Sequence, residues 1–594
     1  MGAFLLVKRT KDLDIEETEK QYHDSLRVFE KMGLRLNQKI VDSEFIIHVF
    51  HKYNYEVENI LRFDNNQFII STGTLIYKKK TGHIALKELF SDFSEDGRFL
   101  TNILGEYCLI VSKNGGLYLL NDLAGLYHVY SNNNRSVISN SFLAVIKSLK
   151  EKTTSTQELY EYIINGACFG DKTIIEEIDL LDSKKIWQLS PDFFTKPKPL
   201  HIKNIYANAP LEETVQELAT NLIDYFNILK ANFGNSIYSA ISGGVHTRLM
   251  LGLMRRVGIE PCYLYVYGDE NNTAGRDANV IQIVKSIAEG EGLSIEYINK
   301  DKLPKFTEDE HIKMLEKRYY LGDGLGHEIG LFDNGADLYY RLLRTKKGKL
   351  QLNGGGGEVL RNYWKLPDRN YPIKSFFKAR YDRMNYSKFS KCFDYESHFT
   401  VLSEKIKVSL GIDKDRLNRL QMELLQPEFD NKYWMGSNNS INNLLSYSLT
   451  PLGDAIFQYK ASSIPIKHKD YYSFEASLMK FIDPDLAKYP TSHGIDLYNN
   501  RLKPLAKAKY FLTLNIPLWL RAYIKKHFWY QESELFRLRG NRVELPFYLT
   551  KNYLDRVFQS RDLYISKYVH IDRIYSPEVL SRVLTAELVI TDRF

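Results

Sequence analysis

A run of small and polar residues at positions 242–248 has the composition of a phosphate-binding turn. Residues 236–241 are predicted to form a short buried strand, and residues 249–256 a helix. Glycines between a strand and a helix let the backbone approach a ligand, while the helix dipole and its unpaired first amides attract negative charge. An ordinary glycine turn is the alternative. The side chains and glycines that could hold an anion here are Ser242, Gly243, Gly244, His246, Thr247 and Arg248.

A second glycine-rich loop follows another short predicted strand at residues 349–352. Four consecutive glycines come directly before an acidic residue. Each glycine costs conformational entropy on folding, so such a run indicates a backbone that passes close to a ligand, with a flexible loop as the alternative. The residues of this loop are Gly354, Gly355, Gly356, Gly357 and Glu358.

The segments around the first turn alternate between strand and helix patterns. Residues 262–267 read as a strand closed by Gly268, residues 274–289 as a helix, and residues 293–298 as a further strand. Short connections between such elements are typical of a doubly wound parallel sheet. Ligands bind such sheets at the carboxyl ends of the strands, which is where the 242–248 turn would lie.

The first 200 residues show a different pattern, in which short β-rich runs alternate with turns. Residues 107–111 and 117–120 are predicted to pair as a hairpin across the turn at 113–116. A helix with an acidic first turn, at about 205–230, is expected to open the second domain.

Several segments, in this order along the chain, resemble the asparagine synthetase family, which includes β-lactam synthetases and lasso-peptide cyclases. Residues 241–247 resemble its Ser-Gly-Gly-X-Asp-Ser pyrophosphate loop, and residues 353–358 its Ser-Gly-Glu-Gly-Ala-Asp-Glu motif. Residues 121–130 resemble part of its glutaminase domain. The remaining two similar segments are residues 450–454, followed by 464–469, and residues 486–495.

The resemblance implies a two-domain fold. An N-terminal α+β glutaminase-like sandwich of the Ntn type is expected at 1–200, followed by an α/β doubly wound ATP-pyrophosphatase-like domain at 205–500. A basic helical extension, 501–594, is expected to pack on the second domain.

The resemblance also implies roles for individual residues. Pyrophosphate would lie on the first turn, and the second glycine loop would form the opposite wall of the site. The adenine side would lie on Val266, Tyr267 and Gly268. Magnesium would be held by Glu358 and Asp454. The catalytic candidates are Glu358 and three lysines for the leaving-group charge, Lys467, Lys469 and Lys488.

Departures from the family pattern bear on activity. The glycine loop lacks the family's early Glu, and the phosphate-binding lysine has no clear match. His246 stands where the family has Asp, and a neutral imidazole is a poor ligand for magnesium, which prefers oxygen. Gly2 stands where the family's glutaminases have their nucleophilic cysteine. Cys108 lies inside a predicted strand, so we expect no glutamine hydrolysis.

The leading functional hypothesis is an ATP-dependent amide ligase that adenylates a small-molecule or peptide carboxylate and transfers the acyl group to ammonia or a substrate amine. The first alternative is a catalytically degenerate protein that binds a nucleotide or a partner. The second is a scaffold that acts through its basic C-terminal segment.

Composition limits the remaining possibilities. The chain has 594 residues, 44% of them hydrophobic and 26% charged, which is typical of a globular protein of two or three domains. Its net charge of +7 equals that of residues 501–550, where ten basic residues face three acidic ones. We expect residues 503–530 to form a cover helix with a solvated basic face; a weak contact with an anionic membrane or polyanion is the alternative. No nucleic-acid-binding signature is present.

The four cysteines are isolated in sequence, and no signal-peptide or membrane-spanning pattern occurs. These features predict a cytoplasmic protein. The oligomeric state has no sequence signal.

Overall fold

The computed structural model describes residues 2–9, 15–41, 44–53, 55–64, 66–189, 210–271, 275–382, 384, 386–525, 545–560 and 562–594. The predicted domain boundary at 200–205 and the end of the basic segment, 526–530, lie outside these residues.

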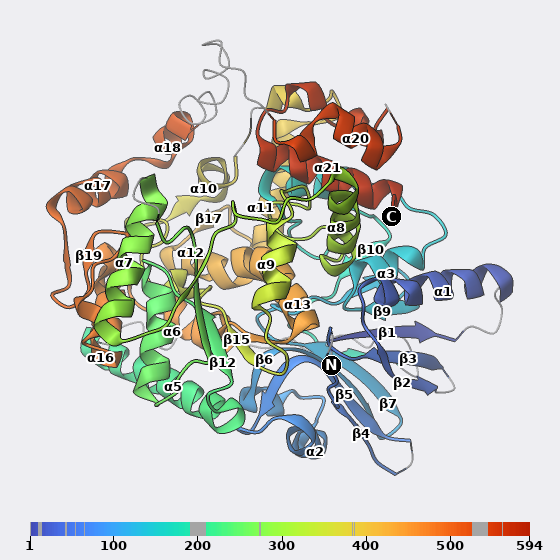
Figure 1. The fold of residues 1–594 in the computed structure, drawn as a ribbon, viewed down its shortest axis with the longest axis horizontal. Helices are drawn as coiled ribbons and strands as arrows, with labels where there is room; N and C mark the ends of the chain where they lie inside the picture. The colour runs from blue at the N-terminus through green and yellow to red at the C-terminus, as the bar shows by residue number, and fades with distance from the viewer. Residues whose placement is uncertain are drawn as a thin grey trace.

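Two antiparallel sheets lie face to face in the N-terminal part (Figure 1). The first has the strand order β10 (Ile178–Leu180), β8 (Tyr130–Asn132), β9 (Val137–Ser139), β1 (Ala3–Lys8), β3 (Phe45–Phe50) and β2 (Leu36–Val41). The second has the order β11 (Trp187–Gln188), β7 (Gly116–Asn121), β6 (Ile103–Lys113), β5 (Phe68–Tyr77) and β4 (Ile60–Arg62). The predicted hairpin is confirmed, because β6 pairs with β7 across residues 114–115.

Successive side chains along each strand point to opposite faces of the sheet, which explains why this region forms layers. Phe4 and Leu6 of β1 pack with Ile110 of β6 in a core between the sheets, whereas Leu5 packs with helices on the outer face. These outer helices are α1 (Ile15–Lys31), α3 (Phe142–Lys147) and α4 (Thr156–Asn165). Helix α2 (Gly82–Asp92) covers the second sheet. The result is a helix–sheet–sheet–helix arrangement.

The expected parallel sheet is present in the second part of the chain. Its order is β14 (Glu296–Ile298), β13 (Tyr263–Tyr267), β12 (Ile237–Ala240), β15 (Leu350–Leu352) and β18 (Tyr447–Leu449), with every neighbouring pair parallel. The chain runs from β12 to β13 and β14 on one side and returns to β15 and β18 on the other. The strand order therefore reverses between β12 and β15, and ligands bind at such a point.

Helices cover both faces of this sheet (Figure 1). One core contains α5 (Leu211–Phe233), α6 (Val245–Arg256), α7 (Gly275–Glu291) and α16 (Ser473–Ile482). On the other face, tyrosines of β12 and β13 pack against α9 (Ala336–Arg344). The chain also forms α8 (Glu308–Leu321), α10 (Ile373–Arg380), α11 (Tyr395–Leu410), α12 (Arg419–Leu425), a π-helix (Gln426–Met435), α13 (Gly436–Leu445), α14 (Ala455–Ser462) and α15 (Ile466–Lys469).

Buried polar contacts join the sandwich to the parallel sheet. Glu106 of β6 accepts hydrogen bonds from Asn439 (3.1 Å) and Asn443 (2.9 Å) of α13. Burial raises the pKa of Glu106 to about 8. Thr74 of β5 donates to Asn443 at 2.7 Å. The two parts therefore share one interface in which polar groups satisfy one another.

The C-terminal segment divides between the two parts of the molecule. After α17 (Pro504–Asn515), helix α18 (Leu518–Ile524) packs on α10, as expected for a cover over the second domain. Beyond α20 (Lys551–Phe558), helix α21 (Pro577–Thr591) instead packs on α4 of the N-terminal part. Since α21 is buried nearly all round, from Val579 to Val589, it behaves as a core helix.

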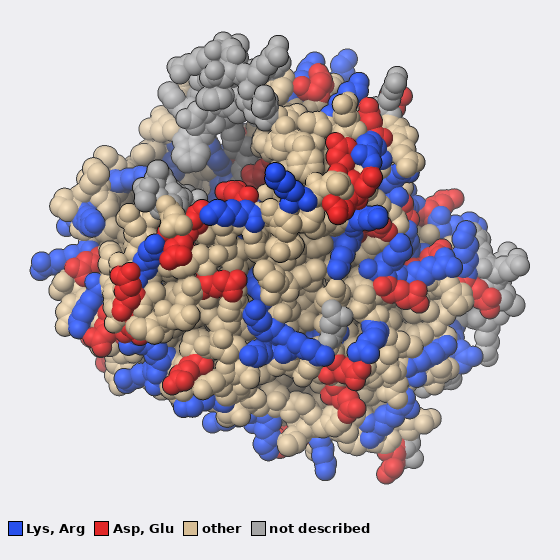
Figure 2. Space-filling model, viewed as in Figure 1, with Lys and Arg blue, Asp and Glu red and all other residues tan. Residues whose placement is uncertain are grey.

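The outer side of α17 and α18 combines basic and apolar side chains. The side chains of Leu505 and Trp519 are 84% and 68% exposed. Over the face shown in Figure 2, basic and acidic side chains are interspersed. Among the described residues, no helix combines the length and apolar character needed to cross a bilayer.

Candidate functional site

A cavity of about 770 Å³ opens at the carboxyl edge of the parallel sheet, where the strand order reverses. The loop after β12 forms one side and the loop after β15 the other. Its lining includes Ser242, Gly244, His246, Thr247, Tyr267, Gly354, Gly355, Gly356 and Glu358, all of which the sequence singled out. The two glycine-rich loops, more than 100 residues apart in sequence, therefore meet as expected.

The first turn is held by its own hydroxyl groups. The amide of Ser242 donates to Thr247 Oγ1 at 3.0 Å, and the two hydroxyl oxygens are 2.8 Å apart. Gly244 N donates to Ser242 Oγ at 3.2 Å. These bonds fix the start of α6, whose N-terminus lies at the cavity. A helix N-terminus at a cavity attracts negative charge.

Glycines allow the two loops to pack closely. A Cβ atom on Gly354 would lie 3.0 Å from Thr247 Cγ2, and one on Gly357 would lie 2.5 Å from the His246 ring. Gly356 adopts φ +82°, where other residues are strained. The glycine run thus permits a close approach of backbone to the other loop.

His246 lies between two carboxylates. Its Nε2 is 2.9 Å from Oε1 of Glu475, a buried residue of α16, and its Nδ1 is 3.8 Å from Oε1 of Glu358. Burial opposes ionisation of Glu475, but Arg361 and His246 outweigh it, and its pKa is lowered. An ionised Glu475 accepts a hydrogen bond, so Nε2 of His246 carries the proton.

Arg361 completes this charged cluster. Its guanidinium is 3.9 Å from Glu358 and 4.0 Å from Glu475. His493 also lines the cavity, and burial lowers its pKa, with Arg361 acting in the same direction. Arg361 could have been noticed three residues after Glu358. No sequence pattern indicated Glu475, because it lies on a helix more than 100 residues away from His246 and Arg361 in sequence.

Arg248 is not brought to the cavity. It is fully buried and donates hydrogen bonds to the carbonyl oxygens of Tyr489 (2.8 Å) and Pro490 (2.7 Å). Burial lowers its pKa to about 10. Its side chain therefore does not face the cavity, so its position does not support the phosphate contact that we predicted. Instead, Arg248 holds the segment that carries His493 against α6.

None of the three predicted lysines lines the cavity. Lys469 is fully buried, with its Nζ 2.6 Å from Glu423. Lys488 is exposed and pairs with Asp485 at 2.7 Å, and Lys467 is exposed. The spacing of these lysines in sequence does not bring them to the first turn.

The predicted metal pair is also separated. Asp454 caps α14 by accepting a hydrogen bond from the amide of Ile456 at 3.0 Å, and burial raises its pKa to about 6. Only Glu358 of the pair lines the cavity. Within the described ranges no three His, Cys, Asp or Glu side chains form a metal-binding group.

Val266, Gly243 and Gly268, which the sequence also singled out, do not line the cavity but lie behind its wall. Val266 lies in the core, and Gly268 at φ +147° leaves room for Ile281. Gly243 accepts a hydrogen bond from the amide of Ser492 at 2.9 Å.

The position expected of a glutaminase nucleophile is closed. A Cβ atom on Gly2 would lie 2.6 Å from the carbonyl oxygen of His51. The amide of Gly2 donates to Phe50 O at 3.1 Å, which holds the backbone in place. No side chain fits here without movement of the neighbouring strand.

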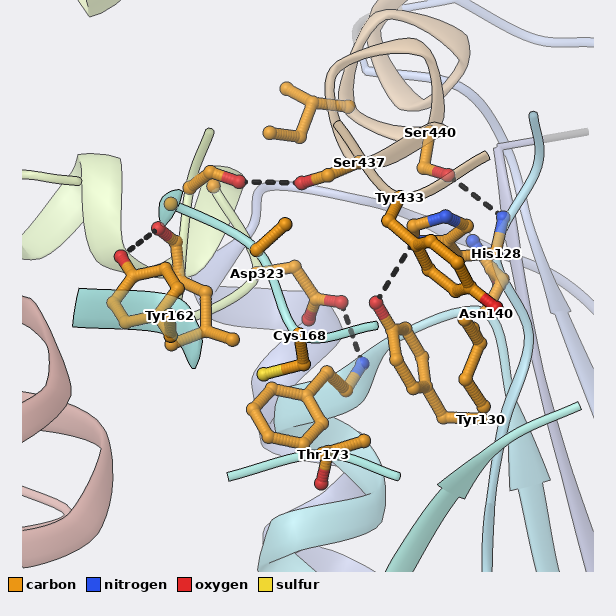
Figure 3. Close-up of a pocket in the computed structure, with 18 of the residues that line it drawn as sticks. His128, Tyr130, Asn140, Tyr162, Cys168, Thr173, Asp323, Tyr433, Ser437 and Ser440 are labelled. Atoms are coloured by element: carbon orange, nitrogen blue, oxygen red, sulfur yellow. Dashed lines mark hydrogen bonds between the residues drawn. The ribbon is translucent and has the colours of Figure 1, made fainter. Parts of the chain in front are cut away.

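A second, smaller cavity of about 80 Å³ lies between the sandwich and the second domain (Figure 3). Its polar groups are satisfied by protein partners. His128 contacts Tyr130 Oη at 3.2 Å and Lys432 O at 2.8 Å. Asp323 accepts hydrogen bonds from Ser141 Oγ and the amide of Phe142, both at 2.6 Å, at the start of α3. The side chains around this cavity therefore join the two parts of the molecule through hydrogen bonds.

The buried imidazole of His128 should make stability depend on pH. Burial lowers the pKa of His128 to about 4, whereas an unfolded histidine titrates near 6.5. Between these values the unfolded chain binds a proton that the folded chain does not, so stability falls as pH decreases from 7 to 4. We expect His128 to contribute about 3 kcal/mol to this loss. Urea unfolding of His128→Gln at pH 7 and pH 4 should show a correspondingly smaller loss than the unsubstituted protein.

The matched control is His23→Gln, since His23 is exposed on α1. It should keep the full pH dependence. An equal loss of stability in all three proteins would contradict the role of His128.

Comparisons with known proteins add little to this geometry. No family model and no curated protein matches the chain. Among solved structures, the chain is similar to glutamine phosphoribosylpyrophosphate amidotransferase from B. subtilis complexed with ADP and GMP, with 9% identity and a TM-score of 0.24 over 51% of this chain and 91% of that one. A structure of the allosteric regulatory enzyme of purine biosynthesis is similar, with 9% identity and a TM-score of 0.24 over 50% of this chain and 80% of that one. These values are too low to carry a functional conclusion.

Proposed function

We propose that the large cavity binds ATP and that the chain is an asparagine-synthetase-like amide ligase that activates a carboxylate without hydrolysing glutamine. The observation that carries this proposal is the meeting of the 242–247 turn and the 354–357 loop at the reversal point of a parallel sheet. In this arrangement the phosphates of ATP would lie at the N-terminus of α6.

Positive charge for the phosphates would come from Arg361, which lies at the cavity, where the lysines we predicted do not. His246 and His493 also line the cavity and would offer hydrogen bonds from their imidazole rings. A guanidinium pairs well with phosphate because two of its donors match two phosphate oxygens. Alignment of the carboxylate with the α-phosphorus and neutralisation of phosphate charge are the main contributions that this chemistry needs. Magnesium remains part of the proposal only through Glu358 and groups of ATP itself.

A second candidate is a nucleotide-binding protein without ligase activity. The contact of His246 with buried Glu475 favours it, because this histidine replaces the carboxylate that the related enzymes use for magnesium. The two candidates share ATP binding and differ in catalysis.

Two measurements separate the candidates. Calorimetric titration should show ATP binding that weakens in the Ser242→Ala/Thr247→Val double variant but not in Thr220→Ala, a change at an exposed threonine of α5. Exchange of labelled pyrophosphate into ATP should then be measured with amino acids, dicarboxylates and peptides. Binding with exchange supports the ligase, binding without exchange supports the second candidate, and no binding overturns both.

The N-terminal sandwich should release no glutamate from glutamine, because position 2 has neither a nucleophile nor room for one. Gly2→Cys should not create the activity, since its Cβ would overlap His51 O. An enzymatic assay for glutamate measures this, with heated protein as the blank. Glutamate release that exceeds the blank and survives Cys108→Ser would overturn this prediction.

A further inference from the structure

Helices α17 and α18 lie at the edge of the molecule, with their inner sides fixed to the second domain (Figure 1). Tyr510 of α17 is 3% exposed, and its ring centre is 4.6 Å from that of Tyr471. Arg521 of α18 donates hydrogen bonds to the carbonyl oxygens of Trp364 (2.9 Å) and Lys365 (2.6 Å). These inner contacts determine which side chains of the two helices face outward.

The outer face of α17 is apolar along its centre. Leu505, Phe511 and Leu512 are 84%, 56% and 63% exposed. Together with the exposed Ala508 they are three, four or seven residues apart, so they share one face of the helix. A helix that only covers a domain presents polar side chains to water. The solvated basic face that we predicted for this segment therefore does not account for these apolar side chains.

Helix α18 adds aromatic rings on its exposed side. Trp519 and Tyr523 are 68% and 52% exposed and lie four residues apart, on the same face. Trp and Tyr are enriched where a membrane meets water, because an apolar ring carries one polar group. An exposed patch of apolar and aromatic side chains indicates a contact surface.

Lysines flank this apolar surface. Lys507 and Lys509 are the neighbours of Ala508 in sequence, so they lie at opposite edges of the apolar face of α17. Lys503 comes directly before the helix, and all three lysines are exposed. The sequence has no acidic residue from 497 to 525. The surface therefore combines apolar side chains at its centre with positive charge at its edges.

We propose that α17 and α18 bind the surface of an anionic membrane and lie in the plane of its interface. The apolar side chains would enter the boundary between headgroups and acyl chains, and the lysines would extend along it to the lipid phosphates. A polyanion such as a nucleic acid would pair with the lysines but would leave Leu505 and Leu512 in water. A second copy of the chain across a two-fold axis would bring like charges together.

Flotation of the full chain with lipid vesicles tests this surface. The chain should float with vesicles of equal parts phosphatidylcholine and phosphatidylglycerol, but not with phosphatidylcholine alone. Binding should weaken when salt rises from about 0.1 M to about 1 M, because the screening length falls from about 10 Å to about 3 Å. The triple variant Lys503→Gln/Lys507→Gln/Lys509→Gln should bind at least about tenfold more weakly, since basic residues near an anionic surface act together.

Two matched variants serve as controls. Lys305→Gln/Lys313→Gln/Lys317→Gln removes the same charge from exposed lysines at or near α8, which lies away from α17 (Figure 1). Val408→Gln removes an apolar side chain that is 82% exposed on α11. Both should bind the vesicles as the unsubstituted chain does. If the triple variant at α8 weakens binding equally, net charge explains the binding and the proposal fails.

The variant Leu505→Gln/Leu512→Gln keeps the charge and separates a membrane from other partners. It should bind the anionic vesicles at least about tenfold more weakly, with an unchanged unfolding temperature, because both side chains already face water. Vesicle binding that this variant leaves unaltered would show adsorption by charge alone and overturn the proposal. Absence of vesicle binding at low salt would also overturn it, whether the chain then binds polyphosphate or forms a dimer that the variant dissociates in sedimentation equilibrium.

Discussion

Arg361→Ala should weaken ATP binding about a hundredfold, which corresponds to about 2.7 kcal/mol. Two effects act in the same direction. The phosphates lose a cation beside the 242–247 turn, and the carboxylates of Glu358 and Glu475, at 3.9 and 4.0 Å from Arg361, lose the charge that offsets them. Calorimetric titration of ATP at one ionic strength measures the change.

A double variant separates these effects. In Arg361→Ala/Glu475→Gln one of the uncompensated carboxylates is neutralised, so ATP affinity should recover in part. Arg369→Ala changes an arginine that does not line the cavity and should leave affinity unaltered. Unchanged affinity in a folded Arg361→Ala protein would show that the phosphates do not lie beside this cluster.

Glu423→Ala should lower the free energy of unfolding by about 3–5 kcal/mol, because it leaves buried cations without their counter-charge. Glu423 is 2.6 Å from Lys469 and 2.8 Å from Arg419, and all three side chains are at most 5% exposed. Burial lowers the pKa of Lys469, and only the charge and hydrogen bond of Glu423 act against this. Urea unfolding at neutral pH measures the loss.

The control is Glu404→Ala, which removes an exposed ion pair with Lys407 and should cost less than about 1 kcal/mol. A further variant, Lys469→Met, tests the phosphate-binding role that the sequence predicted for Lys469. Lys469→Met should be less stable but should bind ATP normally. A folded Lys469→Met protein that has lost ATP affinity would instead support the phosphate-binding role.

Patterns that depend on neighbouring residues were readable from the sequence. The hairpin of β6 and β7, the alternation around β12 and β13 and the two glycine loops all follow from local hydrophobic periodicity and turn composition. The contact between the loops was also predictable, because loops at the carboxyl ends of adjacent parallel strands share one edge of the sheet.

Side-chain directions were not readable in this way. The expected nucleotide contacts included Arg248, yet it lies on the buried side of α6 and binds the carbonyl oxygens of residues 489 and 490. Lys469 is four residues beyond a proline in a segment that resembles a ligase motif, but a buried carboxylate from α12 pairs with it. Sequence spacing determines on which face of a helix a side chain lies. The group that this side chain contacts depends on the other elements of the fold that pack against that face.

The sequence by itself determined where the backbone turns and which strands alternate with helices, because these depend on local propensity and on the period of apolar residues. It also determined that position 2 carries no nucleophile. Only the tertiary structure decided which charges meet at the cavity. Glu475, Arg361 and His246 come from three segments of the chain. The energy of a buried charge depends on its partners across the fold, and no local pattern encodes those partners.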